Sequence, residues 1–219
     1  MLSASRRPLT ETERRFLRSK IRSLTARGRR ASVVALPVTG GVVFILWLWT
    51  ILASDVNRVI VTAFWLIVGA GIAVWVRRDM RSHARDFETM SRGLESALRR
   101  NAADVYDVRA ESFAELEEIE DEGACYAFEM DDGRITFIQG QEFYESARFP
   151  SLDFSLVYIL DEAGQTVDML LDKRGAKARP ARRIPAAVKQ RLDVPDHLEV
   201  RKGRIADLED ILATSSPRA

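Results

Sequence analysis

The sequence predicts an α+β protein: a two-helix transmembrane hairpin, then a juxtamembrane helix, then a small, mainly antiparallel β domain with short C-terminal helices. Three observations predict this fold. Two long runs contain no charged residue, 24 residues in 31–54 and 18 in 59–76. A turn of Asp131, Asp132 and Gly133 separates two runs of alternating apolar residues. Aromatic residues recur beyond residue 104, in a stretch long enough to bury a core.

The two uncharged runs are interpreted as membrane spans of about 33–53 and 59–76. About 20 apolar residues cross a hydrocarbon core of roughly 30 Å, and the second run is only just long enough. A pair of buried helices in a soluble protein is the first alternative, but the remaining chain is too short to cover two helices that are apolar on every side. A cleaved signal peptide is the second, but the first run is too long and 30 residues precede it.

The expected organisation follows these spans. We expect a basic amphipathic cytosolic segment (1–30), a transmembrane hairpin (31–77), a juxtamembrane helix or linker (78–101), a cytosolic α+β domain (104–213) and a disordered tail (214–219). In the first segment, Thr10 and Glu13 fit a capping box, which predicts a helix start. That helix either lies on anionic lipid or is a solvated basic tail.

Basic residues predict the orientation. Residues 1–30 contain ten Arg or Lys against Glu11 and Glu13, four arginines follow the second run, and the bend at 54–58 carries only Arg58. By the positive-inside bias both termini lie in the cytoplasm, so we expect a multi-pass protein of the plasma (inner) membrane. Trp65 is deep in its span and is expected to pack between the helices.

The juxtamembrane helix has an apolar stripe in steps of four and three. Its members are Met80, Ala84, Phe87, Ser91, Leu94 and Leu98. The stripe predicts that the helix at 80–98 pairs with a second copy or a protein partner, or else lies against the chain's own basic helix or C-terminal domain.

The β domain is predicted from turn and strand patterns. One hairpin turns at Asp131–Gly133, and a second runs from 154–160 through 161–165 to 167–171. Residues 104–118 add one or two strands, although a helix also fits. Short helices are expected at 185–192 and 205–212.

Two charged clusters are the candidate sites. The acidic face comprises Glu115, Glu117, Glu118, Glu120, Asp121 and Glu122. It is interpreted as a solvated surface, with a divalent-cation site or catalytic carboxylates as alternatives. The basic block comprises Lys173, Arg174, Lys177, Arg179, Arg182 and Arg183. We expect it to touch the bilayer surface or the acidic face.

No catalytic motif, cofactor site, metal set or nucleic-acid signature is predicted from the sequence. Cys125 is expected to be a small buried residue, and the two histidines, His83 and His197, are not placed beside a nucleophile by the sequence. The arrangement resembles small bacterial inner-membrane proteins with a two-helix anchor and a cytosolic domain. The prediction is a non-enzymatic, membrane-anchored interaction or regulatory module that binds a protein partner, the anionic membrane surface, or both. A membrane-tethered enzyme and an accessory subunit of a transport complex are the alternatives.

Overall fold

The computed structural model describes residues 2–53 and 58–213, without the side chains of residues 27–36 and 53. The expected tail at 214–219 and most of the bend at 54–58 lie outside the described residues. The chain divides into two units, each described by itself. The helical unit holds residues 9–101 and the turn 161–167, and the β domain holds residues 1–8, 102–160 and 168–219.

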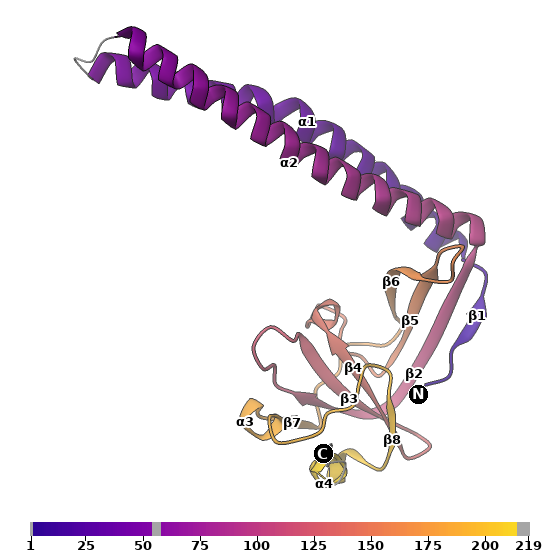
Figure 1. Cartoon of the computed structure of the whole chain (residues 1–219). Coiled ribbons are helices and arrows are strands. Elements are labelled where there is room, and N and C mark those ends of the chain that lie inside the picture. The colour runs from indigo at the N-terminus through magenta and orange to yellow at the C-terminus, as the bar shows by residue number, and fades with distance from the viewer. Residues whose placement is uncertain (1, 54–57, 214–219) are drawn as a thin grey trace. The chain divides into compact units, whose positions relative to one another are not determined.

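The helical unit consists of two long helices that run side by side (Figure 1). They are α1 (Glu11–Ala53) and α2 (Arg58–Arg100). The capping box at the start of α1 is confirmed: the Thr10 N–H donates to the Glu13 carboxylate at 2.7 Å, and the Glu13 N–H donates to Thr10 Oγ1 at 3.3 Å. The helix expected at 78–101 is observed as the uninterrupted second half of α2, as its helical stripe predicts.

Reciprocal hydrogen bonds join the apolar halves of the two helices. Trp47 Nε1 donates to Thr62 Oγ1, and Trp65 Nε1 donates to Thr50 Oγ1, both at 3.3 Å. The expected packing of Trp65 between the helices is confirmed. A Cβ atom built on Gly69 would lie 3.3 Å from Cγ1 of Val43, so a glycine here permits close approach of α1 and α2.

Among the described residues, one helix is long and apolar enough to cross a membrane by length and composition. This helix is α2, and only 6% of its most apolar stretch of 18 residues is buried. The apolar part of α1, Pro37–Leu52, falls in the shorter class of 10–17 residues. The helix pair is therefore observed, but the two-span transmembrane hairpin is not confirmed.

The β domain is α+β with a mainly antiparallel sheet, as predicted. The strands are β1 (Ser5–Arg7), β2 (Ala102–Leu116), β3 (Ala124–Met130), β4 (Arg134–Gly140), β5 (Asp153–Leu160), β6 (Thr166–Lys173), β7 (Arg182–Ile184) and β8 (Val200–Lys202). The order is β6-β5-β2-β3-β4-β8, with β1 and β7 also paired to β2. Both predicted hairpins are confirmed as β3–β4 and β5–β6, and residues 104–118 form most of the single long strand β2.

The long strand β2 belongs to two halves of the sheet. Its first half pairs with β5 and β1, and its second half pairs with β3 and, in parallel, with β7. A shift of register between Ala110 and Ser112 separates the halves. Such an irregularity bends the strand, so one strand can contribute side chains to both halves.

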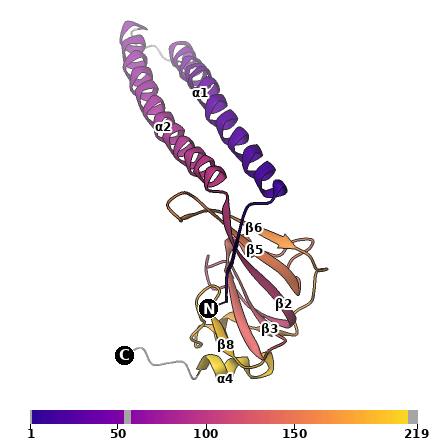
Figure 2. The ribbon, with the colours of Figure 1, turned by 90° about the vertical axis from the view of Figure 1, so that its right-hand side faces the viewer.

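Residues 2–7 belong to the expected basic segment at 1–30, but they are part of the β domain, because β1 lies next to β2 and Leu2 joins the core of that domain. Figure 2 shows this N-terminal segment beside β2. The helix begins only at Glu11, after Pro8 and the capping residue Thr10.

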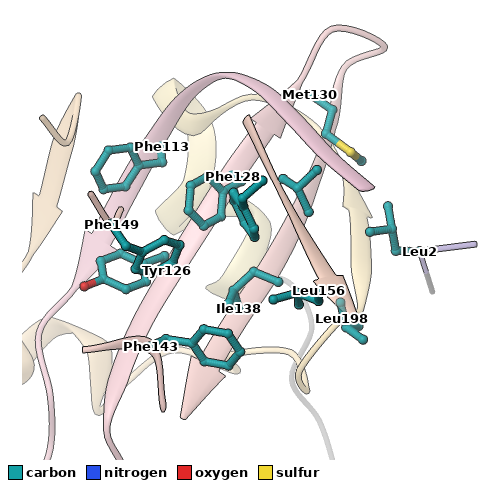
Figure 3. Close-up of a cluster of buried hydrophobic side chains, with 12 residues drawn as sticks. Leu2, Phe113, Tyr126, Phe128, Met130, Ile138, Phe143, Phe149, Leu156 and Leu198 are labelled. Atoms are coloured by element: carbon teal, nitrogen blue, oxygen red, sulfur yellow. The ribbon is translucent and has the colours of Figure 1, made fainter. Parts of the chain in front are cut away.

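Two apolar clusters lie within the β domain. The aromatic cluster has Phe128 near its centre (Figure 3). The Phe128 ring contacts the rings of Phe113, Phe149 and Phe154. The second cluster contains Cys125, Phe137, Ile205 of η2 (Ile205–Asp207), and Leu208 and Leu212 of α4 (Leu208–Ala213). Short helices are thus present at both predicted places, α3 (Ala186–Lys189) and η2 with α4, while η1 (Gln141–Phe143) was not predicted.

Candidate functional site

The acidic face begins at the end of β2 and continues into the loop before β3. Glu115 lies opposite Arg183 in the register of β2 and β7, and the two side chains form an ion pair at 3.0 Å. The Glu117 carboxylate accepts the N–H of Ala186 at the start of α3, at 3.0 Å. These carboxylates hold β7 and α3 beside β2.

Glu118 is engaged by two donors. Its Oε1 accepts the Tyr144 hydroxyl at 2.6 Å and the Gly123 N–H at 2.9 Å. The hydrogen bond from Tyr144, followed by that from Gly123, lowers the pKa of Glu118 below its ordinary value. Glu120 and Asp121 are exposed, and the backbone oxygen of Asp121 accepts the side-chain amide of Gln141 at 3.1 Å.

Glu122 pairs with Lys189, the most buried cation among the described residues of the β domain. Lys189 Nζ lies 3.0 Å from Glu122 Oε2, and the Lys189 side chain is 3% exposed whereas that of Glu122 is 45% exposed. Lysine is almost never buried to this degree without a partner. Nearby Cys125 is buried, as expected, and burial raises the pKa of its thiol to about 11, so the sulfur is protonated near neutral pH.

Within the described residues, no group of three or more His, Cys, Asp or Glu side chains is placed to hold a metal ion. Four carboxylates of the acidic face, those of Glu115, Glu117, Glu118 and Glu122, each bind a different donor elsewhere in the domain. These contacts join the end of β2 and the loop that follows it to β7 and α3.

Most cations of the basic block lie beside acids of the same domain. Arg174 contacts Asp153 at 2.8 Å and Asp107 at 3.1 Å, and Lys177 contacts Glu145 at 2.5 Å. The hydrogen bond from Lys177 lowers the pKa of Glu145. The pKa of Asp107 is also lowered, first by the hydrogen bond from Ser155 and then by Arg174.

The remaining members of the basic block divide into paired and unpaired side chains. Arg182 pairs with Glu209, and Arg183 pairs with Glu115. Lys173 Nζ donates to Ser146 Oγ at 2.9 Å and lies over the Phe149 ring. Arg179 is exposed, and in the described part of the chain no ion pair includes it. The block and the acidic face therefore meet through Arg183 and Glu115, and the block's other ion pairs are made with other acids of the domain.

A histidine–tyrosine pair was missed by sequence reasoning. His197 Nδ1 accepts the N–H of Gln139 at 3.2 Å, and His197 Nε2 lies 2.5 Å from the Tyr158 hydroxyl. Because Nδ1 accepts, the neutral ring carries its proton on Nε2 and donates it to Tyr158. Phe143 stacks on the imidazole with ring centroids 5.2 Å apart.

Burial sets the protonation of this pair. It lowers the pKa of His197 and raises the pKa of Tyr158 to about 12, so both groups are neutral near pH 7. No local pattern signals the pair, because the two residues are 39 positions apart and come from β5 and from a loop. The pair joins these segments by a hydrogen bond.

The predicted partner stripe at 80–98 has a buried residue near the end of α2 and an exposed residue nearer the middle of that helix. Leu94 is buried, as are Ala97 of α2 and Leu17 of α1, whereas Ala84 is exposed. At the end of α2, the turn 161–167 provides Glu162, whose carboxylate accepts hydrogen bonds from Arg99 and Ser96. The hydrogen bond from Arg99 lowers the pKa of Glu162.

Comparison with family models, with curated proteins and with solved structures gives no match to this chain.

Proposed function

We propose that the chain is a membrane-anchored interaction or regulatory module without an enzymatic activity of its own. In this proposal α1 and α2 cross the plasma (inner) membrane as a hairpin, and both termini lie in the cytoplasm. The β domain binds a protein partner, and basic residues contact the anionic membrane surface. Residues 80–98 offer a further contact for a partner or a second copy.

The observation that carries this proposal is the pairing of β1 with β2. These strands flank the helix pair in the sequence, yet Arg7 lies opposite Ala103 in one sheet. A folded sheet lies entirely on one side of a bilayer, because its polar edges and loops do not enter hydrocarbon. The chain between residues 8 and 102 must therefore cross a membrane an even number of times, or not at all.

The exposure of α2 favours two crossings over none. Large side chains along its apolar half are exposed, including Phe64 at 58%, Ile67 at 75% and Val74 at 70%. Exposed apolar surface of this extent is unfavourable in water. If α2 crosses, α1 must provide the second crossing, and residues 33–36, which are apolar in sequence, precede Pro37–Leu52 in the same helix.

The basic residues around the spans support cytoplasmic termini. Residues 1–30 are strongly basic, and Arg77, Arg78, Arg81 and Arg85 follow the second apolar run. The engagement of Glu115, Glu117, Glu118 and Glu122 by neighbours supports a binding module over catalysis or cation binding at the acidic face.

The test is cysteine accessibility in intact cells, with the full chain in a Cys125→Ser background. Ser3→Cys and Ser215→Cys should react with a membrane-impermeant maleimide only after permeabilisation, whereas Asp55→Cys should react in intact cells. Alkaline carbonate should leave the protein in the membrane pellet. Reaction of residues 3 and 215 on opposite sides, or release by carbonate, would contradict the proposal.

A further inference from the structure

Four arginines of α2 line an open groove. The groove has a volume of about 580 Å³ and is lined by Val74, Arg77, Arg78, Arg81, Ser82 and Arg85. The proposed function uses these arginines only as a topology signal. Their arrangement, however, is that of a binding site for a negatively charged group.

The lining residues share one side of the helix. Val74, Arg78, Arg81 and Arg85 follow one another in steps of four, three and four, and Arg77 lies four residues before Arg81. Residues at these spacings are neighbours on a helix surface. The four arginines and Ser82 therefore lie on the same side of the helix instead of spreading around it.

The four arginines are not neutralised by the chain's described acids. In this stretch the contacts of acidic side chains involve other residues: Asp79 lies 3.5 Å from His83, and Glu88 pairs with Arg92 at 2.5 Å. No ion pair of the described residues includes Arg77, Arg78, Arg81 or Arg85, and all four are exposed. This contrasts with the basic block of the β domain, where most cations have an acidic neighbour.

Their depth in the proposed topology matches the headgroup layer. Residues 59–76 of α2 are about 27 Å long at 1.5 Å per residue, close to a hydrocarbon thickness of about 30 Å. Arg77 follows immediately, and Arg85 lies about 12 Å further along the axis. The headgroup region is several ångströms thick on each side, so the first three arginines fall within it.

We propose that this groove binds the phosphate of an anionic phospholipid headgroup, an inference that rests on the proposed membrane insertion. Guanidinium groups bind phosphate oxygens through paired hydrogen bonds, and the Ser82 hydroxyl adds a donor. Val74, at the apolar end of the groove, lies next to the start of the acyl chains. The anionic lipid thereby holds α2 at a defined depth.

The test uses the full chain purified in a non-ionic detergent and given equal amounts of phosphatidylcholine and phosphatidylglycerol. Native mass spectrometry measures the ratio of the two bound lipids. We expect phosphatidylglycerol to be preferred, and the triple variant Arg78→Gln, Arg81→Gln, Arg85→Gln to lose about tenfold or more of that preference. Arg78→Lys, Arg81→Lys, Arg85→Lys should lose part of it, because lysine keeps the charge but not the paired hydrogen bonds.

The matched control carries the same change in net charge away from the groove. Arg92→Gln, Arg134→Gln, Arg201→Gln removes three arginines that each lie beside an acid, and it should keep the wild-type preference. Equal losses in the two glutamine variants, or full retention in the lysine variant, would overturn the groove as a site. Loss of the preference in millimolar inorganic phosphate would reassign the groove to free phosphate and overturn the lipid assignment.

Failure of the proposed function is distinguished by carbonate extraction of the cell membranes, before the protein is solubilised and purified from them. If wild type stays in the membrane pellet but shows no preference for phosphatidylglycerol, only the groove is refuted. If wild type is released, the membrane anchor itself is refuted.

Discussion

The pairing of β1 with β2 predicts that the β domain folds without the helix pair. In a joined form, residues 9–101 are removed, and Pro8→Asn and Ala102→Gly make a two-residue turn between Arg7 and Ala103. Asn-Gly is the preferred sequence for such a turn between antiparallel strands. A truncated form begins at residue 102 and therefore lacks β1 and Leu2.

The contribution of the N-terminal segment can be worked out from its contacts. Leu2 is 9% exposed in the aromatic cluster, and its N–H donates to the Leu198 oxygen at 3.0 Å. Removing a leucine at the edge of a core costs about 2 kcal/mol, and a lost backbone hydrogen bond about 1 kcal/mol. At about 4 °C per kcal/mol these two contacts of Leu2 correspond to about 12 °C. The truncated form also loses the pairing of β1 with β2 and the Arg6–Asp104 ion pair, so it should melt at least about 12 °C below the joined form.

The assay is thermal unfolding followed by circular dichroism, in buffer without detergent. Leu2→Ala in the joined form is the control, and it should lower the melting temperature by about 8 °C, since the packing of Leu2 contributes about 2 kcal/mol. Equal melting temperatures of the joined and truncated forms would refute the contribution of β1 and Leu2. A joined form that stays soluble only in detergent would refute the autonomy of the β domain.

Three further predictions concern the β domain within the full chain. Glu122→Gln leaves the buried Lys189 ammonium without its partner and should lower the free energy of unfolding by about 1–3 kcal/mol in denaturant titrations. The loss is smaller than on breaking a fully buried ion pair, because Glu122 is half exposed. Lys189→Met should lower the free energy of unfolding less than Glu122→Gln, and the reverse order would contradict this reasoning. Gly123→Ala should lower the free energy of unfolding by about 2 kcal/mol or more in the same titrations, because φ is +88° and the added Cβ would collide with the backbone nitrogen of Gln141. An unchanged free energy of unfolding would refute this close approach of residue 123 to Gln141. Burial lowers the pKa of His197 below its ordinary 6.5, so its contribution to stability is complete above pH 6.5 and is lost as the pH falls through the folded pKa. The melting temperature measured from pH 7.5 to 4.5 should therefore fall more steeply for wild type than for His197→Gln, and an equal fall in the two proteins would refute this role.

Local patterns predicted the features whose causes lie within a few residues. The capping box of Thr10 and Glu13, the Asp131–Gly133 turn and the continuous stripe of α2 each depend on neighbours in sequence. The orientation prediction rests on equally local charge counts, and it stays a prediction. None of these patterns contains information about which distant segment will pair with which.

The candidate sites were identified by composition, but their meaning depends on partners far away in the chain. The sequence shows an acidic run at 115–122 and a basic block at 173–183, and it left open whether they face lipid or each other. The structure places Glu115 opposite Arg183 because β7 pairs in parallel with β2. The same non-local packing buries Lys189 and brings His197 to Tyr158.

The sequence by itself determined that two uncharged runs lie between basic segments and that a β-rich region follows, because hydrophobic spacing and turn chemistry are local properties of the chain. Only the tertiary structure decided that residues 5–7 join the sheet beside residues 103–105, across the whole helix pair. Strand pairing is selected by complementary hydrogen bonding and by burial of residues such as Leu2, and these energies exist only once the chain has folded.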